Sequence, residues 1–274
     1  AEVIENLESK SSDYSGNITI TDADATALNA EDLSAIGNKT TGTVTVTNAV
    51  SITGTTAQMI AALVTAGTLV VVSDATVTIS DIPTIAELNA IAAKTTGVVT
   101  ATLAANSLAN LSDLTTAGTD AITITVNDAD AEALTAANLS TLGGKTAGTV
   151  TVTNAVAITG NHDQLTAALV TADTKVEVSD ATVTVNDADT TAITASELSA
   201  IGGATTGTVT VTNAVAITGD HDQVTAALVT AGTKVEVTDA AVTINDADAT
   251  AISATELSAI GSATTGTVTV TNAV

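Results

Sequence analysis

The sequence has no cysteine, no phenylalanine and no tryptophan, and it has one tyrosine, one methionine and one proline. The lack of cysteine excludes disulfide bonds and thiolate metal sites. Without large aromatic side chains, the interior has to be filled by valine, isoleucine, leucine and alanine, which make up nearly all of the 45% of apolar residues. We therefore expect a narrow interior that uses the same few aliphatic side chains in every layer.

Positive charge is also scarce. The six basic residues are all lysines, against 30 acidic residues, and the formal net charge is −24 at pH 7. Such a surface repels nucleic acid and anionic lipid and attracts cations, so we expect no nucleic-acid partner. No apolar run approaches the roughly 18 residues that span a bilayer, so we expect no membrane insertion.

The first residues, AEVIENLESK, have neither the basic start nor the apolar stretch of a signal peptide, and the chain does not begin with methionine. We expect it to be processed, secreted through a signal elsewhere, or cut from a longer chain.

An internal repeat is the strongest signal in the sequence. The string TVTVTNAV occurs at residues 43–50, 149–156, 208–215 and 267–274, and the last two intervals are equal. Residues 149–207 match residues 208–266 at 49 of 59 positions, and we call a unit of this length one repeat. A strict period of this size is typical of stacked structural units, each of which buries its apolar face against its neighbours.

Each repeat divides into a short turn of 25 residues and a long turn of 34, with shorter, more eroded copies towards the N-terminus. We predict a single repeat domain over residues 1–274, with about nine turns and a partial turn at each end, as part of a longer array. The predicted turns are 9–42, 43–67, 68–97, 98–118, 119–148, 149–173, 174–207, 208–232 and 233–266.

Strand and helix patterns alternate within each turn. Val209 and Val211 alternate with threonines, which is the period of a half-buried strand. Val224, Ala227, Leu228 and Ala231 then fall on one face of a helix. Leu257 and Ile260 form a similar face in the long turn. Residues 1–8 resemble the helix of a further short turn.

Helix starts are marked by capping boxes, in which a small polar residue precedes Gln or Glu by three positions. Pro83, the only proline, is expected at the start of a helix. Glycines near the expected helix ends, at Gly67, Gly202, Gly232 and Gly261, are predicted to adopt left-handed backbone conformations. The six capping boxes are Thr55…Gln58, Thr84…Glu87, Asn161…Gln164, Thr194…Glu197, Asp220…Gln223 and Ser253…Glu256.

These patterns predict an α/β fold, a right-handed parallel strand–helix solenoid with alternating short (25-residue) and long (30–34-residue) turns. Strands of successive turns would form parallel sheets with helices on the opposite side, and the right-handed crossover rule favours a right-handed coil.

Acidic residues gather between strand and helix, where equivalent positions of successive turns would form columns. Clustered carboxylates and backbone carbonyls are the ligands that Ca²⁺ prefers, so a calcium site is one interpretation. The other is that these residues cap helices and bind loop amides. The candidate metal ligands are Asp22, Asp24, Asp128, Asp130, Asp187, Asp189, Asp220, Asp222, Asp246 and Asp248.

Three further features are read as structural. Asn or Asp follows the first strand of a turn, where side chains can satisfy backbone groups at corners. His162 and His221 occupy the same position of successive repeats, and a solvated loop histidine is favoured over a metal ligand. Rows of outward threonines resemble ice-binding arrays, but Glu177 and Glu236 with their neighbouring lysines interrupt the plane. The asparagine and aspartate positions are Asn48, Asp74, Asn154, Asp180, Asn213, Asp239 and Asn272.

The Ala/Thr/Val/Asp-rich, lysine-poor repeats resemble those of giant bacterial cell-surface proteins of the cyanobacterial type and of repeat adhesins exported by type I secretion. The resemblance covers most of the chain and is carried by residues 208–219, 226–232, 242–252 and 256–261. It implies an extracellular location, a long array and rigidity that depends on calcium.

We therefore expect a structural module of an extracellular bacterial surface protein, filament, sheath or adhesin stalk, located at the cell surface and without enzymatic activity. Its partners would be further copies of itself, joined end to end or side by side, or flanking repeats. The alternative is a cation- or glycan-binding surface module that depends on calcium. An enzyme, such as a solenoid polysaccharide lyase, is less favoured. A binder or enzyme should have one aberrant turn, and residues 98–118 depart furthest from the repeat.

Overall fold

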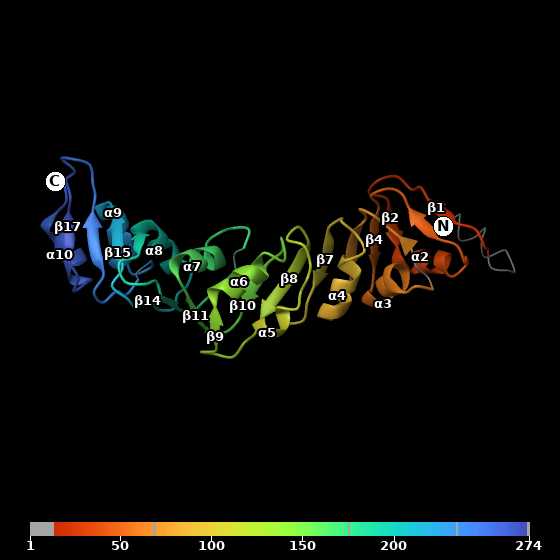
Figure 1. Cartoon of the computed structure of the whole chain (residues 1–274), viewed down its shortest axis with the longest axis horizontal. Coiled ribbons are helices and arrows are strands. Elements are labelled where there is room, and N and C mark those ends of the chain that lie inside the picture. Colours follow the sequence, from red (N-terminus) through yellow and green to blue (C-terminus); the bar gives the residue numbers. More distant parts are fainter. Residues whose placement is uncertain (1–13, 68–69, 175, 234, 273–274) are drawn as a thin grey trace. The chain divides into compact units, whose positions relative to one another are not determined.

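The computed structural model describes residues 14–67, 70–174, 176–233 and 235–272 (Figure 1). The helix expected in residues 1–8 lies outside the described residues, as do Lys175 and Lys234. The chain divides into two compact units. Unit 1 comprises Ala1–Ala105, Ala109–Thr125 and Lys145–Thr149, and unit 2 comprises Asn106–Leu108, Val126–Gly144 and Val150–Val274.

In unit 1, one sheet has the strand order β1-β3-β5, and a second runs β8-β7-β6-β4-β2. Helices alternate with these strands along the chain (Figure 1). The strands are β1 (Ile18–Ile20), β2 (Ala27–Asn29), β3 (Val44–Val46), β4 (Ser51–Gly54), β5 (Val70–Val71), β6 (Thr76–Ile79), β7 (Val99–Thr102) and β8 (Ala121–Val126); the helices are α2 (Ala30–Gly37), α3 (Thr56–Met59), the π-helical turn η1 (Ile60–Val64) and α4 (Ile85–Ala92). Helix α5 (Leu108–Leu111) has residues in both units.

In unit 2, two four-stranded sheets have the orders β14-β12-β11-β9 and β13-β15-β16-β17. Each strand of the second sheet lies one repeat after a strand of the first, so the sheet itself repeats. The elements are β9 (Ala133–Thr135), α6 (Ala136–Gly143), β10 (Val150–Val152), β11 (Ala157–Gly160), α7 (His162–Leu169), β12 (Thr182–Val185), β13 (Ala192–Thr194), α8 (Ala195–Gly202), β14 (Val209–Val211), β15 (Ala216–Gly219), α9 (His221–Leu228), β16 (Ala241–Ile244), α10 (Ala254–Ser262) and β17 (Val268–Val270).

The strand pairings given above are parallel, and their registers mostly place residues of the same type opposite each other on neighbouring strands. Val183 lies opposite Val209 and Thr184 opposite Thr210, so aliphatic and hydroxyl side chains form separate rows. The valines are buried and Thr210 is half-buried. The predicted α/β class with parallel strands is confirmed.

All six predicted capping boxes are present, with both the side-chain and the backbone hydrogen bond formed. Pro83 immediately precedes Thr84, the N-cap of α4, as expected. The predicted face of α9 is confirmed for Val224, Ala227 and Leu228, which are at most 1% exposed. Ala231 lies beyond the helix, because the Ala227 carbonyl accepts from the Val235 N–H and no longer continues the helical pattern.

The prediction of left-handed glycines is wrong, since no described glycine has a positive φ. The left-handed positions are Ala25, Ala131, Thr190 and Ala249, in the acidic loops. Glycines are needed instead where two backbone segments of one long turn approach each other closely, as those of Gly207 and Ala181 do. A Cβ on Gly207 would lie 2.2 Å from the carbonyl oxygen of Ala181.

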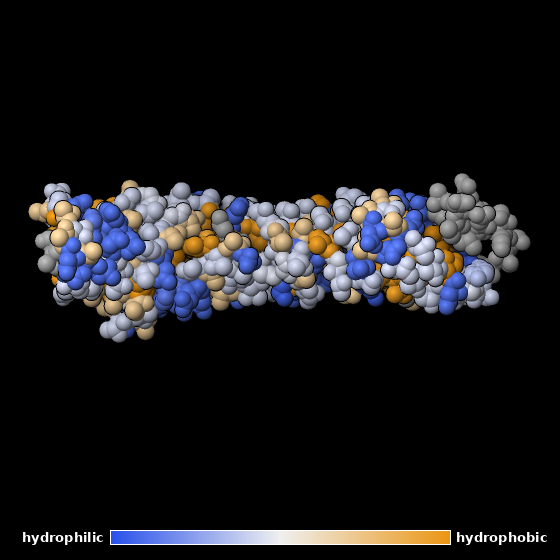
Figure 2. Space-filling model, turned by 90° about the horizontal axis from the view of Figure 1, so that it is seen from above, coloured by the Kyte–Doolittle hydropathy of each residue, from blue (hydrophilic) through white to orange (hydrophobic). Residues whose placement is uncertain are grey.

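The surface consists largely of small and polar residues. The face in Figure 2 is mostly hydrophilic or intermediate in hydropathy, with hydrophobic residues in patches between. None of the helices in the described part of the chain has the length and apolar character needed to span a bilayer.

Candidate functional site

One carboxylate recurs beneath the start of each described short-turn helix; it is buried at Asp187 and Asp246, half-buried at Asp128 and exposed at Asp81. The first residue of the helix donates its backbone N–H to an aspartate of the following long turn, 25 residues ahead in three turns and 20 in the fourth. The donor–acceptor pairs, from backbone N to carboxylate oxygen, are Thr56–Asp81 (2.7 Å), Leu108–Asp128 (2.7 Å), His162–Asp187 (2.7 Å) and His221–Asp246 (2.9 Å). Each carboxylate thus satisfies a helix N–H that has no partner inside the helix.

In three of the four turns, the side chain of the same helix residue also reaches this carboxylate. The rings of His162 and His221 place Nδ1 2.7 Å from Asp187 Oδ1 and 2.6 Å from Asp246 Oδ1. In the earlier turn, the Thr56 hydroxyl donates to Asp81 Oδ1 at 2.7 Å. In the earlier turn a threonine therefore makes the contact that a histidine makes in the two later turns.

A second carboxylate lies beside each histidine. Nε2 of His221 is 3.5 Å from Asp222 Oδ1, and Nε2 of His162 is 3.4 Å from Asp163 Oδ1. Asp222 is exposed, whereas Asp246 is buried. The structure therefore brings two of the predicted site residues, Asp222 and Asp246, to one histidine ring, while Asp220 is the N-cap of α9 and accepts from the Gln223 N–H.

The acidic loop also binds the turn that follows it. The carbonyl of the first aspartate accepts from the side-chain amide of the next asparagine: Asn48 to Asp22 (2.6 Å), Asn154 to Asp128 (2.6 Å), Asn213 to Asp187 (2.5 Å), and Asn272 to Asp246. The asparagines thus satisfy backbone groups at corners, as predicted, by binding the loop.

The next aspartate of the loop accepts from a backbone N–H of the following turn, at 3.1 Å in each case. The pairs are Asp24 with Ala49, Asp130 with Ala155, and Asp189 with Ala214. The left-handed residue after it returns the contact, since Thr190 N–H donates to the Ala214 carbonyl at 2.8 Å. The loop therefore connects the turn before it to the turn after it.

These bonds favour the interpretation of the aspartates as caps and loop acceptors. Among the described residues, no three or more His, Asp or Glu side chains are grouped so as to hold a metal ion. The residue that would pair with Asp248, by analogy with Ala214 and Asp189, is residue 273, which lies outside the described residues. Asp22 and Asp222 are exposed, so their carboxylates are accessible to cations from solvent.

Sequence reasoning missed two structural features. Asp81 was not recognised because the motif around it, Ser80-Asp81-Ile82, lacks the usual Asn-Asp-Ala-Asp; its position 25 residues after Thr56 is the signal that identifies it. The other is a Thr-x-Gly corner, in which a threonine hydroxyl accepts from the glycine N–H and donates to a carbonyl 20 to 26 residues earlier in the same long turn. The corners are Thr40/Gly42, Thr95/Gly97, Thr146/Gly148, Thr205/Gly207 and Thr264/Gly266.

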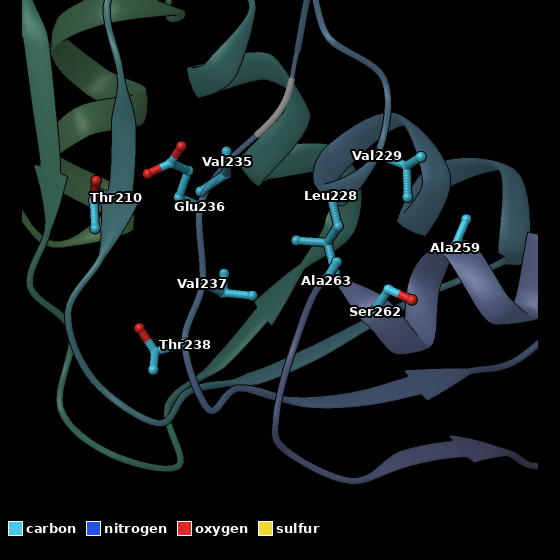
Figure 3. Close-up of a pocket in the computed structure, with 10 residues that line it drawn as sticks. All are labelled: Thr210, Leu228, Val229, Val235, Glu236, Val237, Thr238, Ala259, Ser262 and Ala263. Atoms are coloured by element: carbon cyan, nitrogen blue, oxygen red, sulfur yellow. The ribbon is translucent and has the colours of Figure 1, made fainter.

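A hollow of about 470 Å³ lies between the end of α9 and the start of the next long turn. Leu228 and Val237 point towards each other across it, and Glu236 is the one ionisable residue in its lining (Figure 3). A hollow of about 460 Å³ recurs one repeat earlier, where Glu177 takes the place of Glu236. The lining contains no nucleophile paired with a base.

The electrostatics of the buried pair follow from its hydrogen bonds. The bond to the Asp246 carboxylate raises the pKa of His221 above its ordinary value, although burial of the ring acts in the opposite direction. Burial alone would raise the pKa of Asp246, but the bonds from the ring and backbone N–H of His221 outweigh it and hold that pKa below its ordinary value.

Together, the raised pKa of His221 and the lowered pKa of Asp246 define the pH range in which the pair stabilises the fold. A raised His221 pKa gives stabilisation that is complete below the unfolded value of about 6.5 and is lost as the pH rises through the folded value. A lowered Asp246 pKa gives stabilisation that is present above the unfolded value of about 3.9 and is lost as the pH falls through the folded value. The pair therefore stabilises the fold fully between about pH 4 and 6.5.

We expect the replacement Asp246→Asn to lower the pKa of His221 towards about 6.5, because the anionic partner is lost. The measurement is an NMR titration of the His221 ring. The ring signals of His162, whose partner Asp187 is intact, should be unchanged and serve as the internal reference. An unchanged His221 titration would show that the ion pair does not form.

Comparisons with family models, with curated proteins and with solved structures found no match to the chain.

Proposed function

We propose that the chain is a structural repeat module of an extracellular bacterial surface protein, filament, sheath or adhesin stalk, in which the parallel strand–helix turns form a right-handed solenoid. The observation that carries the proposal is that the same helix-start N–H to carboxylate bond recurs in four short turns. A contact that recurs from turn to turn holds an array together, whereas an active site needs one special turn.

The most divergent stretch supports this proposal. Residues 98–118 still provide β7, which pairs in parallel with β6 and with β8. Leu108 still donates its N–H to Asp128, as the helix starts of the regular turns do to their own aspartates. The divergent stretch has therefore kept the strand pairing and the helix-start contact of the repeat.

The strong negative charge fits a surface location, because it keeps neighbouring chains soluble and apart. The proposed partners are further copies of the chain or flanking repeats. An antibody raised against the chain should label intact producing cells. Labelling only after the cells are permeabilised would contradict the extracellular location.

A mechanical role has its own test. Stretching the chain in a single-molecule force experiment should give steps that correspond to whole repeats, each of which adds about 200 Å of extended chain. A single step for the whole chain, or steps unrelated to the length of one repeat, would contradict an array of mechanically equivalent units.

The alternative function, calcium-dependent binding of a cation or glycan, is tested by chelation. Because most of the loop carboxylates accept hydrogen bonds from the protein, we expect the midpoint of thermal unfolding to be the same in excess calcium and in excess chelator at fixed ionic strength. A fall of more than about 5 °C on chelation would exceed the effect of about 1 kcal/mol in a chain of this size. It would favour the calcium-dependent alternative.

A further inference from the structure

The imidazole rings of His162 and His221 each use one nitrogen for a buried carboxylate and present the other to an exposed one. Asp187 and Asp246 accept from Nδ1, so the neutral ring carries its proton on Nδ1 and its lone pair on Nε2. The two side chains are 14% and 15% exposed, so neither is the solvated loop histidine that the sequence favoured. A carboxylate holds metal-binding histidines in the same way, through the nitrogen that does not bind the metal.

An exposed carboxylate lies beside Nε2 in both repeats. Nε2 of His162 is 3.4 Å from Asp163 Oδ1, and Nε2 of His221 is 3.5 Å from Asp222 Oδ1. These distances exceed the range of about 2.7 to 3.2 Å for a usual N–H···O hydrogen bond. They match the separation of about 3.3 to 3.5 Å between two ligand atoms that each lie about 2.0 to 2.2 Å from a tetrahedral zinc ion. The aspartate side chains are 81% and 87% exposed, so an ion from solvent can reach them.

The histidine and the exposed aspartate occur together along the chain. The helices of two earlier short turns begin with Thr56-Ala57 and Leu108-Ala109, which provide neither donor. A carboxylate nevertheless accepts the helix-start N–H in both of these turns. The helix-start contact therefore does not require the exposed aspartate. What this aspartate adds in the two later turns is an oxygen donor next to Nε2.

An imidazole nitrogen beside a carboxylate oxygen is a donor set for divalent transition metals such as Zn²⁺, whereas Ca²⁺ prefers oxygen donors alone. We propose that the pairs His162–Asp163 and His221–Asp222 each bind one divalent transition-metal ion through Nε2 and the carboxylate, with water completing the coordination. Each site has two protein donors, which agrees with the lack of larger groups of such donors among the described residues. The strong negative charge of the chain concentrates cations at its surface.

The test is isothermal titration calorimetry of the full chain with Zn²⁺ at neutral pH, in excess Ca²⁺, which occupies sites made of oxygen donors alone. We expect two saturable sites per chain. The variant His221→Thr should leave one site, and the double variant His162→Thr/His221→Thr should leave none. Threonine has no nitrogen donor but keeps the contact with the carboxylate at the helix start, as Thr56 does.

Two further variants separate the site from general attraction by negative charge. Asp222→Ala reproduces Ala57 of the earlier turn, and it should weaken binding at its own site about tenfold or more while the site of His162 is unchanged. Asp113→Ala removes the same charge from an exposed position outside both sites and should leave both unchanged.

Absence of saturable Zn²⁺ binding, or unchanged binding by the double variant, would overturn the proposal, as would an equal loss in Asp222→Ala and Asp113→Ala. Circular dichroism verifies that the double variant is folded. If it is not, Asp222→Ala alone decides, because Asp222 is exposed and its removal leaves the contact of His221 with Asp246 in place. The proposed structural function requires no metal, so this inference goes beyond it and can fail separately.

Discussion

Replacing Gly207 with alanine should lower the free energy of unfolding by about 3 kcal/mol or more, at the upper end of the range for overpacked positions. The new Cβ would lie 2.2 Å from the Ala181 oxygen and 2.7 Å from the Asp180 oxygen, both of which belong to the backbone. Backbone atoms cannot move aside as the end of a side chain can, so the two segments of this long turn must separate. The Thr205 hydroxyl, which bonds the Ala181 carbonyl and the Gly207 N–H, would lose its partners as they do.

Gly232 provides the matched control. Nothing lies within 4 Å of a Cβ built there, and its φ is not positive. Gly232→Ala should therefore leave stability unchanged or raise it by up to about 1 kcal/mol, because alanine restricts the unfolded chain. The measurement is urea-induced unfolding of both variants. Equal effects of the two substitutions would contradict the close approach of Gly207 to the backbone of Ala181.

Replacing Leu198 with alanine should cost about 2 to 5 kcal/mol, because a fully buried leucine leaves a cavity that its surroundings fill only in part. Leu198 is 0% exposed, and it lies on α8, against which α9 packs. The substitution thus tests whether the helices of successive turns share one core.

Leu257→Ala is the control for this prediction, since Leu257 occupies the same position of the next repeat but is half-buried. Its cost should be about 1 kcal/mol, the average for point substitutions. The difference between the two losses of unfolding free energy measures how much burial beneath the following short turn stabilises Leu198. Similar losses for both would show that Leu257 is as well packed as Leu198.

Local features of the fold could be predicted from the sequence. Each capping box lies within four residues, so the pattern of small polar residue and Gln or Glu contains all the information that its hydrogen bonds need. The buried rows are equally local, since Val209 and Val211 follow a period of two. The parallel pairing followed from the repeat, because equivalent strands of successive turns run in the same direction.

Contacts between turns could not be predicted in the same way. The carboxylate of Asp246 binds the start of a helix 25 residues earlier, and its carbonyl binds Asn272, 26 residues later. No local sequence pattern indicates which loop packs against which helix. The glycine prediction failed for the same reason, since Gly207 is required by the backbone of Ala181 and not by its own φ.

The candidate site shows the same difference between features that the local sequence predicts and contacts that it does not. The acidic motif between strand and helix repeats along the sequence, and this repetition identified the acidic loops. The residue types in the loops could not show whether their aspartates bind cations or accept hydrogen bonds. The structure shows Asp187 and Asp246 as acceptors of hydrogen bonds from helix N–H groups. The comparison of His162 with Thr56 then assigns the histidines to the same structural contact.

The most direct test of the account is the removal of one complete repeat. Deletion of residues 149–207 joins two copies of the same sequence in register, because residues 208–266 match the deleted ones at 49 of 59 positions. If the repeats are interchangeable, we expect this variant to fold, with an unchanged circular dichroism signal per residue and cooperative unfolding. Deletion of residues 149–178, about half a repeat, should leave loops and helices without their partners and abolish cooperative unfolding. If the whole-repeat deletion unfolds the chain, or if the shorter deletion is tolerated equally well, the claim of interchangeable repeats is contradicted.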